Sequence, residues 1–177
     1  GAFFALVDAH KLGFKIAPDE ARDLADLGHR ITAAAAAQVP VRHPANPKIK
    51  RISFTHFGSP PRGKKKRRRS TVVVEPGRLD RSPCGTGVMA KMAALHARGE
   101  LKVGETLHLD SVTGTYFLAD IVKTTKIDRT PAIVPRVSGR AWISAVMEIG
   151  HDPTDPFPKG FTLTDTWGPG RTDAVAV

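Results

Sequence analysis

The sequence contains a single cysteine among 177 residues, and aromatic side chains make up only 6% of it. One cysteine excludes an internal disulfide and the zinc sites that are built from several cysteines. No run of about 18 apolar residues is present, and the first residues lack the basic start and long apolar core of a signal peptide. From these absences we expect no membrane-spanning helix, no export signal and a location in the reducing cytoplasm.

Positive charge is plentiful but local. The formal net charge is +10, and seven positive charges lie between Arg62 and Arg69, so the rest of the chain is near +3. Such a run is typical of a solvated loop between two strands. Non-specific binding of a polyanion through this run is the alternative. No aromatic residue lies between Gly58 and Thr115 to stack on bases, so we do not expect a nucleic-acid partner.

Apolar patterning predicts two helices and a series of short strands. The helices are expected from Pro18 to about Val39 and from about Pro83 to Arg98. The predicted strands are Phe3–Val7, Ile49–Phe57, Thr71–Glu75, Thr106–Leu109, Thr115–Lys123, Ala132–Val137, Arg140–Ile149 and, last, Phe161–Trp167. The predicted fold class is therefore α+β, with a curved, mostly antiparallel sheet and two helices.

The segment Asp80–Gly87, with the sequence DRSPCGTG, carries the most chemical information. Ser82 is a good N-cap and Pro83 suits the first helical position, which would place Cys84 inside the first turn of the helix. Unpaired N–H groups and the positive end of the helix dipole lie there and favour a thiolate. We therefore expect the pKa of Cys84 to lie below that of a free cysteine.

The neighbours of Cys84 suit a small zwitterionic ligand. Gly85 and Gly87 have no side chains to block an approaching group, and their N–H groups, with the Thr86 hydroxyl, can cradle a carboxylate. Asp80 can accept hydrogen bonds from a substrate ammonium group. A thiol, an anion cradle and a carboxylate within eight residues indicate an amino-acid substrate, although a lone cysteine is also common as a small, inert buried residue.

The DRSPCGTG segment resembles the second catalytic motif of the proline racemase family. Gly1–Asp8 is similar to the GGxFxAxVD strand of that family, with Ala2 where a second glycine is usual. Further similarity is found at His43-Pro44, Val73–Gly77, Ala90–Gly99, Gly139–Ile143, Asp155–Phe157 and Gly160-Phe161.

This resemblance implies a fold like that of diaminopimelate epimerase, in which two similar α/β lobes each wrap a curved sheet round a helix and the site lies between them. Residues 1–158 would be the second, C-terminal lobe, and residues 159–177 would be a final strand and tail that return to the first lobe. The activity implied is inversion at the Cα of proline or 4-hydroxyproline, by two thiols on opposite faces of the substrate and without cofactor or metal. By the motif match, Cys84 is one of these thiols, Gly85 and Thr86 hold the substrate carboxylate, and Asp80 holds the ring nitrogen.

The sequence departs from the family in one important respect. The first-lobe motif with the opposing cysteine or serine is absent, and Ser82 lies on the same helix start as Cys84 and cannot reach the opposite face. We therefore expect the site to need a missing first lobe or the second copy of a homodimer. Relatives that dehydrate trans-3-hydroxyproline typically carry threonine in place of Cys84, so the cysteine favours a racemase or epimerase. A catalytically inactive fragment or binding module that keeps the carboxylate cradle is the alternative.

Overall fold

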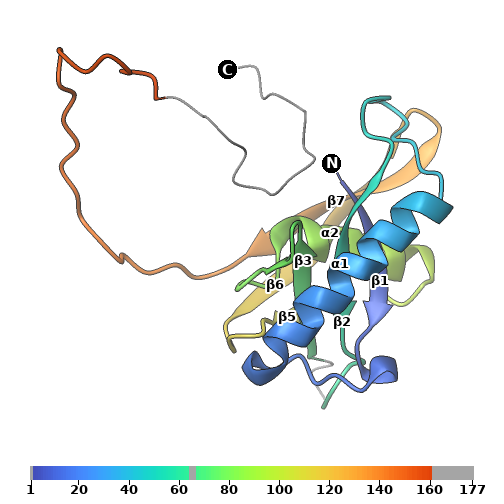
Figure 1. The fold of residues 1–177 in the computed structure, drawn as a ribbon. Coiled ribbons are helices and arrows are strands. Elements are labelled where there is room, and N and C mark those ends of the chain that lie inside the picture. The colour runs from blue at the N-terminus through green and yellow to red at the C-terminus, as the bar shows by residue number, and fades with distance from the viewer. Residues whose placement is uncertain (1, 64–66, 161–177) are drawn as a thin grey trace. The chain divides into compact units, whose positions relative to one another are not determined.

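The computed structural model describes residues 2–63 and 67–160 of the chain. Two helices, α1 and α2, are inserted in a series of strands, and two short 3-10 helices (His10–Leu12 and Pro18–Glu20) follow the first strand (Figure 1). In chain order the elements are β1 (Phe3–Asp8), α1 (Ala21–Gln38), β2 (Ile52–Gly58), β3 (Arg68–Val74), β4 (Arg78–Leu79), α2 (Gly85–Ala97), β5 (Thr106–Asp110), β6 (Tyr116–Ile127) and β7 (Thr130–Ser138).

Within the described residues, the seven strands form one sheet in the order β1-β2-β3-β5-β6-β7, with β4 paired to β3. The pairs β1–β2 and β3–β5 are parallel, and the other pairs are antiparallel. The α+β class predicted from the sequence is confirmed. Both predicted helices and the predicted strands up to residue 138 are present, with bounds that differ by a few residues.

Helix α1 packs on one face of the sheet, over β2 and β3 (Figure 1). Its Gly28 lies so close to β3 that an added Cβ would be 2.4 Å from a methyl group of Val73. The hydroxyl oxygens of Thr32 and Thr55 lie 2.9 Å apart, and each lies 2.9 Å from the Gly28 carbonyl oxygen, which accepts a hydrogen bond from this pair. The apolar core on this side consists of Ala9, Ile16, Leu24, Phe57, Val73 and Val112.

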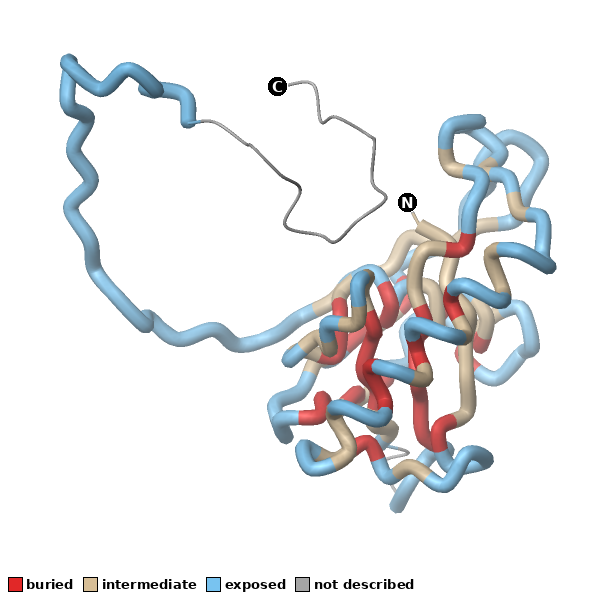
Figure 2. Tube along the Cα trace, viewed as in Figure 1, coloured by how far each residue is buried: buried red, intermediate tan, exposed pale blue. Residues whose placement is uncertain are grey.

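Helix α2 lies on the opposite face, where the sheet curls round it, and the buried segments concentrate between these layers (Figure 2). The core on this side combines α2 with β5 and β6: Val88, Met92, Leu95, Leu101, Leu107, Leu109, Ala119 and Ile121. This is the curved sheet round a helix that the family resemblance implied. Because α2 begins directly after Asp80–Cys84, this packing also positions the predicted site.

Three sequence-based predictions need comment. The strand predicted over Arg140–Ile149 is wrong: residues 139–150 form no strand in the structure. The chain divides there into a compact unit that ends at Arg140 and a second unit from Ala141 onward. The loop predicted for the basic run is also wrong in part, because Arg68 and Arg69 belong to β3. The predicted strand Phe161–Trp167 lies outside the described residues.

A histidine is buried on the α2 side of the sheet. His56 of β2 is 1% exposed, and neither ring nitrogen hydrogen-bonds to another described residue. Burial, together with the nearby charge of Lys91, lowers the pKa of His56 to about 4 from an ordinary value of 6.5. The folded protein therefore holds this ring neutral over a pH range in which the unfolded chain would protonate it.

We predict that His56 makes the fold sensitive to acid. Its neutral ring contributes stability that is fully present above about pH 6.5 and is lost as the pH falls towards 4, by about 3 kcal/mol in total. In urea unfolding at a series of pH values, His56→Leu should flatten this part of the profile. His29→Gln, which removes an exposed histidine of α1, should leave it unchanged. If the free energy of unfolding fell as much between pH 6.5 and pH 4 in His56→Leu as in the unmodified protein, the assignment to His56 would be contradicted.

Candidate active site

The loop that leads into α2 is held against β3. The Asp80 N–H donates to the Val72 carbonyl at 2.9 Å, and the Thr71 hydroxyl donates to the Asp80 carbonyl at 3.1 Å. The Thr113 hydroxyl, from the turn after β5, donates to the Arg81 carbonyl at 3.1 Å. This loop is therefore fixed from two sides, and the sequence pattern gave no signal for Thr113 because its partner is 32 residues away.

Cys84 occupies the N-cap position of α2 and not the first turn, so the predicted order of cap residues is wrong. The Gly87 N–H donates to Cys84 Sγ at 3.4 Å, and the Cys84 backbone has a φ of 65°. Ser82, the predicted cap, is engaged elsewhere: its hydroxyl donates to Asp80 Oδ1 at 3.0 Å and accepts from the Cys84 N–H at 3.1 Å. The sulfur thus takes the hydrogen bond that a serine or aspartate oxygen normally accepts at a cap.

Gly87 sets how closely the first turn of α2 approaches the sheet. A Cβ at this position would lie 2.7 Å from Val72 Cγ2 and 3.0 Å from His56 Cδ2. By contrast, a Cβ on Gly85 would meet no atom within 4 Å, so the space beside Gly85 is open. The two glycines of the motif therefore have different roles: Gly87 lets the helix turn pack closely on the sheet, and Gly85 leaves open space beside the turn.

The same first turn presents backbone donors. The N–H of Gly87 bonds to Cys84 Sγ, and the N–H of Val88 bonds to the Cys84 carbonyl. The N–H groups of Gly85 and Thr86, the first two of the helix, have no carbonyl to bond within it. These two N–H groups and the Thr86 hydroxyl, which lies 3.6 Å from Cys84 Sγ, are hydrogen-bond donors beside the thiol of the kind that an anion can accept.

The electrostatics of the thiol differ from the sequence-based prediction. Cys84 is 9% exposed, and this burial raises the pKa of its thiol above the ordinary value. The Gly87 N–H and the Thr86 hydroxyl act in the opposite direction, and Asp80 adds to the rise. The predicted lowering of this pKa is therefore wrong, because burial and a neighbouring carboxylate outweigh the hydrogen bonds from Gly87 and Thr86.

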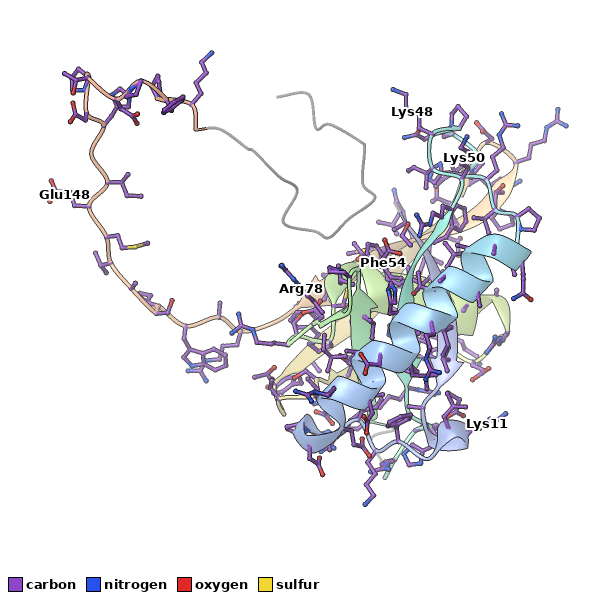
Figure 3. The ribbon with its side chains drawn as sticks, in the orientation of Figure 1. Lys11, Lys48, Lys50, Phe54, Arg78 and Glu148 are labelled. Carbon is purple, nitrogen blue, oxygen red and sulfur yellow. The ribbon has the colours of Figure 1, made fainter. Side chains whose placement is uncertain are left out.

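An aromatic pair lies at the same end of α2. The Phe4 and Phe54 rings, from the neighbouring strands β1 and β2, have centroids 5.2 Å apart. Phe54 shares its strand face with His56, which contacts the first turn of α2 at Gly87. The next residue on this face, Gly58, lies near Lys91, one turn further along α2, so Phe54 lies towards the Cys84 end. Figure 3 labels Phe54 in the fold. Both rings are partly exposed.

Comparison with known proteins agrees with this arrangement. The chain matches the proline racemase family over residues 1–162. It is 37% identical to a probable proline racemase from Agrobacterium radiobacter K84, solved with bound carbonate, with a TM-score of 0.77. It is 35% identical to a hydroxyproline epimerase from Agrobacterium vitis, solved with bound trans-4-hydroxy-L-proline, also with a TM-score of 0.77.

The chain belongs to the proline racemase family. The two structural matches cover 96% of this chain but only 49% and 48% of the respective relatives. The chain therefore spans about half the length of the relatives it matches. The fold prediction from the DRSPCGTG motif is confirmed, since the relatives share the fold with this chain over nearly all of its length.

In this member of the family, arginines of the basic run bond to other parts of the fold. Arg67 makes two hydrogen bonds to the carboxylate of Asp110 at the end of β5. Arg68 lies 3.9 Å from a carboxylate oxygen of Glu100, and its side chain is only 15% exposed. These contacts link Arg67, just before β3, to β5 and Arg68 of β3 to the segment after α2, so part of the charge that suggested a polyanion site is paired within the fold.

Among residues 2–63 and 67–160, no three histidine, cysteine, aspartate or glutamate side chains gather as metal ligands would. In the same residues, neither helix is both long and apolar enough to cross a bilayer.

We predict that the two motif glycines respond differently to alanine. Gly87→Ala should destabilise the fold by about 1–3 kcal/mol, because the new methyl group would press on Val72 and His56. Gly85→Ala should change stability by less than about 0.5 kcal/mol, because its methyl group enters open space. Thermal or urea unfolding of both variants measures the difference, and equal effects would contradict the packing described here.

We also predict an unusually high titration midpoint for Cys84. The rate of iodoacetamide alkylation, followed by mass spectrometry against pH, should rise at a higher pH than for an ordinary cysteine, because burial raises the pKa of the thiol. Asp80→Asn should lower this midpoint, since asparagine can still accept the hydrogen bonds from Ser82 but carries no charge. Asp26→Asn, at an exposed position of α1, is the matched control and should leave the midpoint unchanged. A midpoint that does not fall in Asp80→Asn would refute the role given to this carboxylate.

Proposed function

We propose that this chain supplies one half of the active site of a cofactor-independent isomerase that inverts the Cα of 4-hydroxyproline or proline. The observation that carries the proposal is the position of Cys84. Its sulfur caps α2 beside the N–H groups of Gly85 and Thr86, and Asp80 lies close enough to act on its pKa. An amino acid whose carboxylate binds those N–H groups brings its Cα near the thiol and its ammonium group near Asp80.

The raised pKa of Cys84 suits one direction of such a reaction. A protonated thiol can donate a proton to one face of the substrate carbanion while a base on the other face has removed the α-proton. In the reverse direction, Cys84 must lose its proton and act as the base. Binding of the substrate ammonium group beside Asp80 would offset the negative charge that raises the pKa of the thiol, so the substrate itself would ease this deprotonation.

The substrate class draws support from the relatives and from the aromatic pair. The Agrobacterium vitis relative holds trans-4-hydroxy-L-proline, and the apolar rings of Phe4 and Phe54 offer a surface on which a pyrrolidine ring can pack. Gly85, with open space beside it, leaves room for the substrate carboxylate.

A two-base inversion needs a second proton carrier on the opposite face of the substrate. Cys84 is the only cysteine of the sequence, and Ser82 is bound to Asp80 and to the Cys84 N–H on the same side of the site. We therefore infer that the opposing acid or base comes from a second polypeptide segment that corresponds to the half of the relatives that this chain does not match.

We predict Cys84-dependent inversion when the site is completed. The chain would be co-expressed with the unmatched half of the Agrobacterium vitis relative, and L-proline and trans-4-hydroxy-L-proline would be analysed by chiral chromatography. Cys84→Ser should lower the rate by about 10²–10⁴-fold, the usual contribution of a general acid or base. Met89→Leu, which removes a partly exposed sulfur of α2, should retain the rate. Inversion that survives in Cys84→Ser would refute the proposed role, and no inversion in any combination would favour a binding module.

A further inference from the structure

Two side chains on the α2 side of the sheet carry buried nitrogens without a hydrogen-bond partner among the described residues. These atoms are His56 Nδ1 and Nε2, on β2, and Arg68 Nε, on β3. Arg68 shares its strand face with Val72, which contacts the first turn of α2 at Gly87, as His56 does. Buried polar groups in folded proteins are nearly always bonded, so these nitrogens indicate a partner such as a bound water or ion.

A small space lies between His56 and Lys91, beside Gly58 of β2. The point that a Cβ on Gly58 would occupy is 3.8 Å from Lys91 Nζ, 3.6 Å from His56 Cε1 and 3.9 Å from His56 Nδ1. These are the nearest atoms to that point apart from those of Gly58 and its two chain neighbours. A group of about the size of a methyl therefore fits there, in contact with both the imidazole ring and the ammonium group.

Positive charge is in excess around Lys91. Burial lowers the pKa of this half-buried ammonium group, and the nearby charges of Arg68 and Arg98 add to the effect. Glu100 and Asp8 act in the opposite direction, so three cations face two carboxylates. Glu100 lies 3.9 Å from Arg68, and none of the ion pairs formed by the described residues includes Lys91. A half-buried cation without a paired carboxylate favours an anion beside it.

We propose that a single halide ion such as chloride binds between β2 and α2 beside Gly58, held by the Lys91 ammonium group and an N–H of the His56 ring. The methyl-sized space suits a monatomic anion better than phosphate or sulfate. A neutral imidazole carries one N–H that can donate to the ion, and the charge of Lys91 strengthens the binding. Lys91 lies one helical turn beyond Gly87, and binding of the ion requires no catalysis, so the proposal goes beyond the proposed function.

The test is urea unfolding in which chloride replaces gluconate at constant ionic strength. An ion that binds only the folded protein raises the unfolding midpoint as its concentration rises, and gluconate is too large for the space. Lys91→Gln removes the charge. Gly58→Ala fills the space with a methyl group that meets no atom closer than 3.6 Å, at a residue whose φ is not positive. Both variants should lose the chloride dependence, whereas Lys102→Gln, at an exposed position, is the matched control and should keep it.

Two spectroscopic measurements locate the ion. The folded protein should broaden the chlorine NMR line of the buffer, and this broadening should be lost in Lys91→Gln and in Gly58→Ala. Chloride should also raise the pKa of His56 from about 4, because an adjacent negative charge favours the imidazolium, while the exposed His29 should not respond.

Three results would overturn the proposal. Equal chloride dependence in all four proteins would mean an adventitious ion only. Retention of the dependence in either Lys91→Gln or Gly58→Ala would place the ion elsewhere. If the unmodified protein responds to chloride in none of these measurements, water and not a halide fills the space.

Discussion

The close approach of the first turn of α2 to β2 and β3 is the constraint on which the rest of the site depends. Only a residue without a side chain fits between the turn and the side chains of Val72 and His56, and Gly87 provides it. The loop before this turn is held as well, because the Asp80 N–H bonds to Val72 of β3 and the Arg81 carbonyl accepts a hydrogen bond from Thr113, in the turn after β5. A thiol at the junction has little freedom, and this is what a group that must meet a single substrate carbon requires.

The same packing determines the charge state of the thiol. A helix terminus by itself favours a thiolate, and the hydrogen bond from Gly87 to Cys84 Sγ acts in that sense. Yet the sulfur is buried and faces a carboxylate, so the net effect is a raised pKa. A cysteine with a raised pKa beside Asp80 fits a site in which the charge of the bound substrate, rather than the protein alone, controls when the thiol ionises.

Much of the fold could be predicted from the sequence because it depends on local patterns. The alternation in Ile49–Phe57 correctly separates His56, on the α2 side, from Thr55 and Phe57, on the α1 side. Features that depend on distant residues could not be predicted in this way. Cys84 and not Ser82 caps α2, because the Ser82 hydroxyl bonds to Asp80. Strand β3 begins within the basic run, next to Arg67, whose partner Asp110 lies 43 residues away in the sequence. The apolar stretch Arg140–Ile149 predicted a strand, but a strand also needs a neighbouring strand, and within the described residues this stretch forms none.

The most direct test of the account is solvent deuterium incorporation at the Cα of trans-4-hydroxy-L-proline in D₂O, followed by NMR for this chain and for Cys84→Ser. A thiol that carries the α-proton on one face can exchange it with solvent even when no second group completes an inversion. The account predicts deuterium at Cα with retained configuration for this chain alone, and none above background for Cys84→Ser. Equal incorporation by both proteins would contradict the claim that Cys84 is the proton carrier.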